Sequence, residues 1–149
     1  MDHIVYVDAQ QGELENLLCW SARMLVRGAT GRKLPYGRVQ VGNRLFFVEN
    51  DGKCLARAWA EVTSVINSTP LSPEESRLLV ECNQKQLQLS HKQVQCWSGK
   101  RFLVLIGLGQ VSSLAPFTFD RSAFGKMDDW LPVGDVEHIK IEEQMTTPG

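Results

Sequence analysis

Four basic residues gather in one glycine-rich segment that contains no acidic residue. The segment covers positions 27–42 and holds Arg27, Arg32, Lys33 and Arg38, with Tyr36 among them. Glycine-rich turns let backbone N–H groups approach an anion, arginine holds a phosphate with two parallel hydrogen bonds, and lysine adds a point charge. A tyrosine ring can stack on an unpaired base. We therefore predict that Arg32, Lys33, Tyr36 and Arg38 bind nucleic acid or a nucleoside; the alternative is an ordinary solvated loop with Tyr36 buried.

The sequence on either side of this segment predicts the elements that hold it in place. Apolar residues at helical spacing over 12–27, with acids near the start and arginines near the end, predict an amphipathic helix that stops at Gly28. After the segment, 44–49 has the pattern of a strand, and a turn follows at 50–52. Residues 55–66 alternate as a long second strand, so the two strands are expected to form a hairpin.

The second half of the chain predicts helices followed by strands. Ser72, Pro73 and Glu75 carry the cap, first-turn and capping-box signals of a helix start, and a short helix is expected over 90–97. The apolar run 102–108 predicts a central strand, with 111–119 as its neighbour. Residues 120–135 have the composition of a surface segment. No repeated βαβ unit occurs, so the order of the predicted elements argues against a doubly wound parallel sheet. It favours one mixed domain over 1–142, followed by a flexible tail over 143–149.

The basic segment resembles the motif GxKxxExR of the ASCH branch of the PUA-like superfamily. Gly31, Lys33 and Arg38 match the motif, and the Gly-Asn-Arg sequence at 42–44 is similar to the family's entry into a barrel strand. With the order of the flanking elements, the resemblance extends over residues 12–108. It implies an α+β fold with a PUA-like small, curved β-barrel and flanking helices. It also implies a cleft between barrel and first helix, edged by the motif loop, that binds RNA or a modified nucleoside.

The same resemblance implies a possible hydrolytic site. One branch of the family removes an acyl group from an N-acylated cytidine, using a motif lysine, a threonine three residues later and a glutamate in a later helix. This sequence keeps the lysine as Lys33, carries Tyr36 in place of both the motif acid and the threonine, and offers Glu81 as the best-placed glutamate. If the chain is a hydrolase, Lys33 and Glu81 would act as the acid/base pair and Tyr36 as the oxyanion donor.

Composition limits the other classes of function. The 149 residues include 16 basic and 17 acidic ones, and the net charge is −1, so any nucleic acid must bind a local basic face. The four cysteines are widely separated, which predicts reduced, packed thiols; we expect neither a metal nor a cofactor. The sequence shows no signal peptide and no apolar run long enough to cross a bilayer. We therefore expect a cytoplasmic protein without a membrane partner.

Two further features lie just before the predicted central strand. Lys100 and Arg101 directly precede it and can extend the basic face, although charge that merely flanks a strand is the commoner explanation. Trp97 is interpreted as a helix-packing residue. Three functions stay open: an RNA- or nucleoside-binding module, a small amidohydrolase, and a non-catalytic protein-interaction domain.

Overall fold

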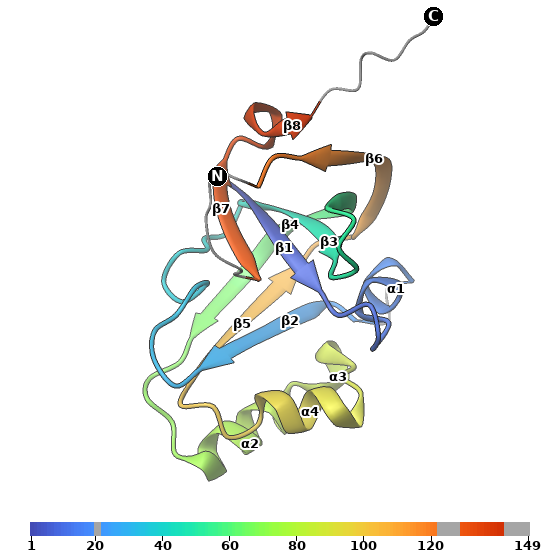
Figure 1. Ribbon diagram of the computed structural model, residues 1–149. Helices are drawn as coiled ribbons and strands as arrows, with labels where there is room; N and C mark the ends of the chain where they lie inside the picture. The colour runs from blue at the N-terminus through green and yellow to red at the C-terminus, as the bar shows by residue number, and fades with distance from the viewer. Residues whose placement is uncertain (20–21, 122–128, 142–149) are drawn as a thin grey trace, which may run out of the picture.

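The structure is a computed structural model that describes residues 1–19, 22–121 and 129–141 (Figure 1). The tail predicted over 143–149 lies outside the described residues. In chain order the elements are β1 (Asp2–Val7), α1 (Glu13–Leu18), β2 (Met24–Ala29), β3 (Arg44–Glu49), β4 (Leu55–Asn67), α2 (Pro73–Cys82), α3 (Gln84–Leu87), α4 (His91–Trp97), β5 (Phe102–Leu108), β6 (Ser112–Phe119), β7 (Trp130–Gly134) and β8 (Lys140–Ile141), with a 3₁₀ turn at Val136–His138 before β8.

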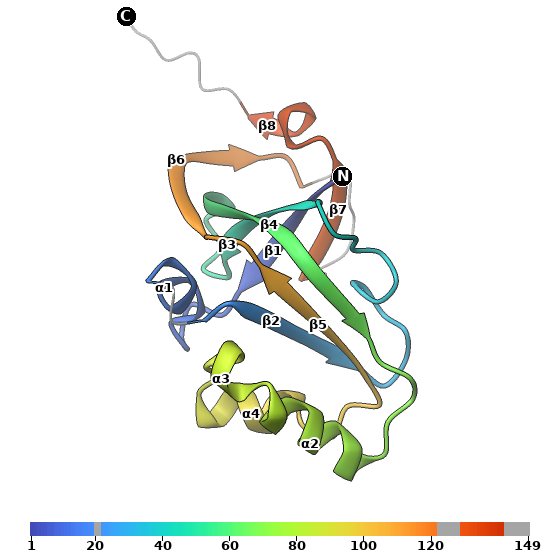
Figure 2. The same cartoon turned by 180° about the vertical axis from the view of Figure 1, so that it is seen from behind.

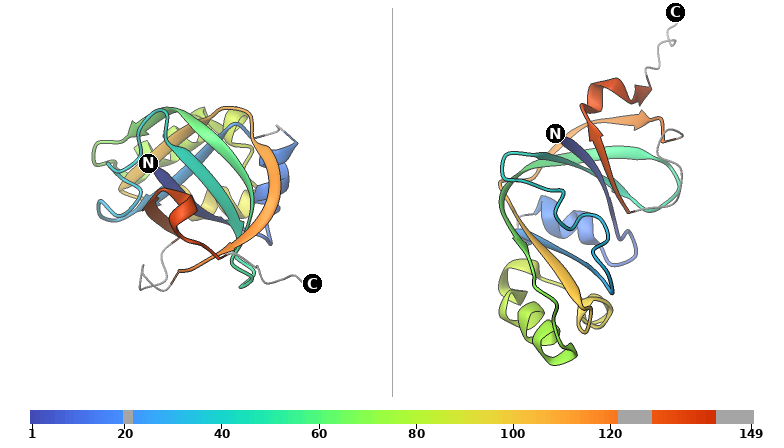
Figure 3. Two further views of the ribbon diagram at one scale, coloured as in Figure 1. Left: turned by 90° about the horizontal axis from the view of Figure 1, so that it is seen from above. Right: turned by 90° about the vertical axis from the view of Figure 1, so that its left-hand side faces the viewer.

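The eight strands form one strongly curved mixed sheet (Figures 1 and 3). Hydrogen bonds join them in the order β2-β5-β4-β3-β1-β7, and β6 branches from β4 to pair with β8. β1 runs parallel to β3, and the other pairs are antiparallel. The predicted α+β class is confirmed. The predicted small, curved β-barrel is present only as a curved sheet that does not close, because no ladder between described residues joins β2 to β1 or β7. The side chain of Arg27 in β2 spans this gap instead.

The helix expected over 12–27 is the largest error of the sequence analysis. Only Glu13–Leu18 is helical, and Met24–Ala29 forms β2, which pairs antiparallel with β5. β2 is buried on both faces: Met24 and Val26 pack against the helices, while Leu25 lies in the interior of the sheet. A strand covered on both faces is a continuous apolar run, and periodicity alone does not distinguish such a run from a buried helix.

Several other predictions are confirmed. β3 and β4 form the expected antiparallel hairpin, and every residue of β5 is buried, as expected for a central strand. Ser72 and Glu75 form the predicted capping box at the start of α2, and α4 occupies the helix predicted over 90–97. Two predictions are wrong. β6 pairs with β4 and β8 rather than with β5, and the supposed surface segment 120–135 contains β7, in which Trp130 is buried.

Three apolar clusters hold the elements together. The first fills the concave side of the sheet and includes Leu25, Phe47 and Ile106; the second lies between the β1–β3–β4 strands and the β6–β8 region. The third joins β2 and β5 to the helices α2–α4, which cover one face of this strand pair (Figures 1 and 2). None of the described helices is long and apolar enough to span a membrane. The four cysteines form no disulfide with one another, but three are exposed rather than packed: Cys19, Cys82 and Cys96.

Candidate functional site

A cleft of about 260 Å³ opens where β1, α1, β2 and α4 meet, close to the gap in the sheet. Its walls come from the end of β1 and the segment after it, from Arg27 in β2, and from α4. α4 is far from the other three elements in the sequence, and β1 and β2 form no ladder with each other, so the site depends on how the gap between β1 and β2 is held open.

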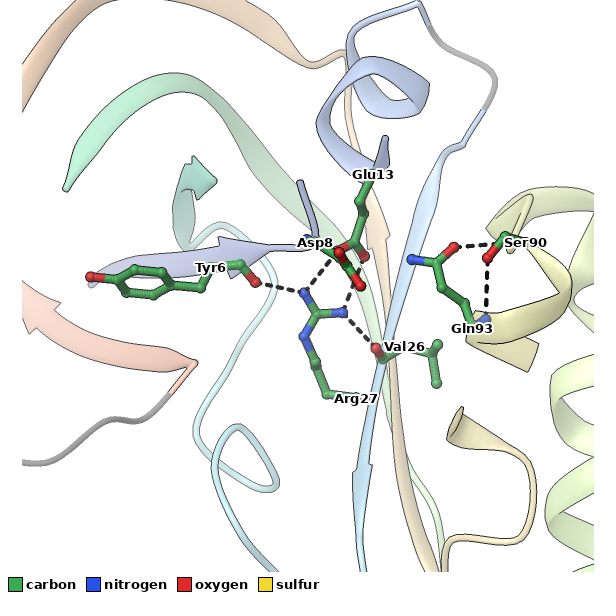
Figure 4. Close-up of polar contacts among 7 residues, drawn as sticks. All are labelled: Tyr6, Asp8, Glu13, Val26, Arg27, Ser90 and Gln93. Carbon is green, nitrogen blue, oxygen red and sulfur yellow. Dashed lines mark hydrogen bonds and ion pairs between the residues drawn. The ribbon is translucent and has the colours of Figure 1, made fainter. Parts of the chain in front are cut away.

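The side chain of Arg27 bridges the gap between β1 and β2. It lies two residues after Leu25, and alternation along a strand therefore places both side chains on the interior side of β2. Its Nη1 donates to the carbonyl of Val26 at 2.8 Å, and its Nη2 donates to the carbonyl of Tyr6 in β1 at 3.0 Å (Figure 4). The guanidinium thus bonds to the backbone of two strands that share no ladder.

Glu13 neutralises this buried cation. Its carboxylate lies 3.3 and 3.5 Å from the two terminal nitrogens of Arg27, and both residues are more than nine-tenths buried. Glu13 also accepts a hydrogen bond of 2.9 Å from the backbone N–H of Asp8, which fixes the start of α1 against the end of β1. Removing either partner of such a pair leaves an uncompensated buried charge, so the pair is expected to be structural.

α4 supplies the opposite wall through Gln93 and Trp97. The backbone N–H of Ser90 donates to Oε1 of Gln93 at 3.0 Å, and the Ser90 hydroxyl accepts from the backbone N–H of Gln93, which completes a capping box. The amide nitrogen of the buried Gln93 therefore points to the side of the cleft where Glu13 and Asp8 lie (Figure 4). Trp97 ends the helix, with its ring centre 5.7 Å from the Arg27 guanidinium carbon.

The cleft continues toward the predicted basic loop. A smaller cavity of about 60 Å³ shares Arg27, Trp97 and Asp129 with the cleft, and its far end is lined by Lys33. Lys92 lines the main cleft from α4. The lining is mixed in charge: Arg27, Lys33 and Lys92 stand against Asp8, Glu13 and Asp129. Since Arg27 is neutralised by Glu13, the lysines are the cations left to meet a ligand.

The structure places the predicted site residues in different settings. Lys33 is exposed and lines the smaller cavity. Tyr36 is half-buried: its hydroxyl donates to the carbonyl of Ser68 at 2.6 Å, and its ring meets Phe102 edge-on at 5.4 Å. Arg32 is exposed and stacks on both of these rings, with its guanidinium carbon 5.8 Å from the centre of Tyr36 and 5.6 Å from that of Phe102.

The remaining two predicted residues lie away from the cleft. Arg38 is exposed and lines neither the main cleft nor the two small cavities beside Lys33. Glu81 is exposed near the end of α2, where its carboxylate accepts a 2.7 Å hydrogen bond from Arg77. Of the three residues considered for hydrolysis, Lys33 and Tyr36 share the lining of a small cavity, while Glu81 is engaged elsewhere.

Sequence reasoning missed the centre of the site. The helical spacing over 12–27 places Arg27 at the end of a helix, and the Glu13–Arg27 pair leaves no periodic signal, because α1 and β2 meet only in the folded chain. Trp97 was interpreted as a packing residue; it does pack against the helical cluster, and it also lines the cleft. The buried Gln93 could have been noticed as the third helical residue after the cap Ser90, which is the capping-box spacing.

The fold is similar to crystal structures of the ASCH protein of Zymomonas mobilis. A tyrosine-to-phenylalanine variant superposes with a TM-score of 0.67 at 11% identity, over 92% of this chain and 93% of that chain. A serine-to-alanine variant gives 0.65 at 10% identity, over 92% and 91%. A third ASCH structure from the same organism gives 0.61 at 10% identity, over 86% and 82%. No family model matches the sequence, and no curated protein matches it. The chain therefore has the fold of the ASCH domain.

Proposed function

We propose that the chain binds a nucleoside unit, either free or within RNA, in the cleft between β1, β2 and α4. The observation that carries the proposal is that one cleft is lined by the Trp97 ring and by hydrogen-bonding groups of α4 and of the facing wall, next to a basic loop. The ASCH fold agrees with this function, because the resemblance of the motif at 31–38 implies the binding of RNA or modified nucleosides.

Trp97 offers a surface on which a base can stack. Arg27 contacts the Trp97 ring, and the apolar cluster of α2–α4 packs against it, so the ring is held in place. Stacking of a base on an aromatic side chain contributes about 1–3 kcal/mol and tolerates any base. A fixed ring loses little conformational freedom when the ligand binds.

The polar lining suits a base better than it suits a bare phosphate. Gln93 presents an amide donor, and Asp8 presents a carboxylate that accepts from the backbone N–H groups of Gln10 and Gln11 and is part of no described ion pair. Bases carry donors and acceptors along one edge, whereas a phosphate carries only acceptors and is repelled by a carboxylate. The volume is slightly below the roughly 300 Å³ at which drug-sized ligand pockets begin, which fits a single nucleoside.

Hydrolysis is less well supported than binding. It requires Lys33, Tyr36 and Glu81 to face one substrate, whereas the Tyr36 hydroxyl donates to Ser68 and the Glu81 carboxylate pairs with Arg77. The geometry therefore favours a binding function.

Calorimetric titration of the full chain with each ribonucleoside monophosphate tests the proposal. Trp97→Leu should weaken binding by about tenfold or more, since stacking is worth about 1–3 kcal/mol. Trp59→Leu is the matched control, because Trp59 is also half-buried but stacks on Phe46 in another cluster. Lys33→Ala should weaken binding by about fivefold, for a hydrogen bond worth about 1 kcal/mol. Arg38→Ala, in the same loop, should weaken binding less than Lys33→Ala, because Arg38 lines neither the cleft nor the smaller cavity.

Two results would contradict the proposal. One is the absence of binding by the wild-type chain for all of the monophosphates. The other is equal weakening by Trp97→Leu and Trp59→Leu, which would mean that general destabilisation rather than loss of a stacking surface caused the change.

A further inference from the structure

The carboxylate of Asp8 lines the cleft and is held there by backbone hydrogen bonds. Its Oδ1 accepts from the backbone N–H groups of Gln10 and Gln11 at 3.0 and 3.3 Å. The Asp8 backbone is fixed as well, because its N–H donates to Glu13 Oε1 at 2.9 Å and its carbonyl accepts from the Glu13 N–H at 3.2 Å. An ionised carboxylate can accept about four hydrogen bonds. Two acceptor positions are used by no described residue and remain for a ligand.

The side-chain amide of Gln93 presents a donor to the same cleft. Gln93 is only 6% exposed, yet it lines the cleft. Its Oε1 accepts from the Ser90 N–H, so the amide nitrogen Nε2 is the end turned toward the side where Asp8 and Glu13 lie (Figure 4). Nε2 donates to no other residue in the described part of the chain. Because a buried donor without a partner is costly, this nitrogen is placed to meet a ligand.

A chain of hydrogen bonds ties the Asp8 carboxylate to the Gln93 amide. Gln11 donates its backbone N–H to Asp8, and its side-chain Oε1 accepts from the Ser90 hydroxyl at 2.5 Å. Ser90 in turn donates its N–H to Gln93 Oε1 and accepts from the Gln93 N–H. The segment after β1 is thus fastened to the start of α4, so an acceptor and a donor are pre-organised on two walls of one cleft.

Among the four RNA bases, guanine best complements a carboxylate with two open acceptor positions. Its Watson–Crick edge carries two neighbouring donors, the ring N1–H and the 2-amino group, next to the acceptor O6. Adenine and cytosine place one amino donor beside a bare ring nitrogen, and uracil places one N–H between two carbonyls. A lone pair of these three bases would therefore face the negative carboxylate, whereas guanine would give it two charge-assisted hydrogen bonds.

We infer that the cleft selects guanine, with Asp8 accepting from N1–H and the 2-amino group, Gln93 donating to O6, and Trp97 stacking on the ring. The inference rests on the proposed function and names the base that this site takes. Asp8 is the specificity-determining residue, because stacking on Trp97 tolerates every base and every base offers an acceptor to an amide donor.

Calorimetric titration of the full chain with the monophosphates of guanosine, inosine, adenosine, cytidine and uridine tests the inference. Guanosine monophosphate should bind about tenfold more tightly than each of the others, because hydrogen bonds to a charged group are strong. Inosine monophosphate is the matched ligand: it lacks only the 2-amino group and keeps N1–H, O6 and the stacking surface. The comparison of these two ligands uses the wild-type chain alone, so it does not depend on the folding of a variant.

Asp8→Asn should abolish the preference, so that guanosine and adenosine monophosphate bind with similar affinity. Asp51→Asn is the matched control, since Asp51 is also a loop carboxylate whose Oδ1 accepts from a backbone N–H, that of Lys53 at 3.0 Å, but it does not line the cleft. This control removes the same charge and should keep the preference. The ratio of the two affinities is the readout, because general destabilisation of the fold would weaken both ligands alike.

The outcomes separate this inference from the proposed function. Equal affinities of the guanosine, inosine and adenosine monophosphates for the wild-type chain would overturn the inference and leave nucleoside binding in place. A preference for guanine that persists in Asp8→Asn, or that Asp51→Asn also abolishes, would overturn it too. If none of the monophosphates binds, the proposed function fails and the inference fails with it.

Discussion

Arg27 and Arg32 lie five residues apart in the chain, yet the fold uses their charges in opposite ways. Arg27 is 7% exposed, is neutralised by Glu13, and bonds to carbonyls of β1 and β2, which do not pair with each other. Arg32 is exposed, stacks on two aromatic rings, and forms no ion pair with any described residue. The presence of basic residues in a segment therefore does not by itself locate a binding surface. One arginine shapes the cleft, and the other remains available for a ligand.

The largest effect expected from this comparison is on stability. Arg27→Met should lower the free energy of unfolding by about 3–5 kcal/mol, because it leaves the Glu13 carboxylate buried without its partner. Arg27→Met/Glu13→Leu should recover much of the loss, since no buried charge then remains. Urea denaturation of the variants measures both changes.

Arg32→Met is the control for that experiment and should change the free energy of unfolding by less than about 0.5 kcal/mol. Similar losses of unfolding free energy in Arg27→Met and Arg32→Met would contradict the assignment of Arg27 as structural and Arg32 as available to a ligand. An unchanged free energy of unfolding in Arg27→Met would contradict it as well.

A smaller effect concerns another buried polar group, His3, which the fold keeps neutral. Burial lowers the pKa of His3 below the usual 6.5, and the hydrogen bond of 3.0 Å to Asn43 only partly offsets this. The Trp130 indole donates to Nδ1 of His3 at 3.0 Å, so the proton sits on Nε2, which donates to Asn43. Protonating Nδ1 would therefore disrupt a contact between β1 and β7.

The sign of the resulting pH dependence follows from the depressed pKa. Below pH 6.5 the unfolded chain binds a proton that the folded chain does not, so stability is full above this pH and falls as the pH is lowered. One proton sets the upper limit of this slope at about 1.4 kcal/mol per pH unit. Urea denaturation between about pH 5 and 7 should show stability that falls with pH in the wild type and a smaller fall in His3→Gln. An identical slope in both chains would assign the effect to another group.

The sequence predicted the local elements well and the long-range contacts poorly. The β3–β4 hairpin and the capping boxes of α2 and α4 follow from neighbouring residues, and all three are present. β2 was mistaken for helix because both of its faces are buried. The open sheet and the pairing of β6 with β4 depend on contacts between distant segments, which periodicity does not report.

In the candidate site, too, the sequence predicted local features but not contacts between distant segments. The basic loop is visible in the sequence, and Lys33 from this loop lines the smaller cavity beside the cleft. The contact of Arg27 with Glu13 and Trp97 has no counterpart in local spacing, because it joins β2, α1 and α4. A role in binding or catalysis stays a prediction, to be tested by binding and activity measurements, for Arg32, Lys33, Tyr36, Arg38 and Glu81.

The central claim, that a nucleoside unit occupies the cleft beside Trp97, is tested most directly by ¹H–¹⁵N NMR during titration with a ribonucleoside monophosphate. We predict shifts of the side-chain amide signals of Gln93 and of the indole N–H of Trp97, which line the cleft, while the indole signal of Trp59 stays in place. Shifts confined to α2 or β6, or no shift at saturating ligand, would contradict the claim.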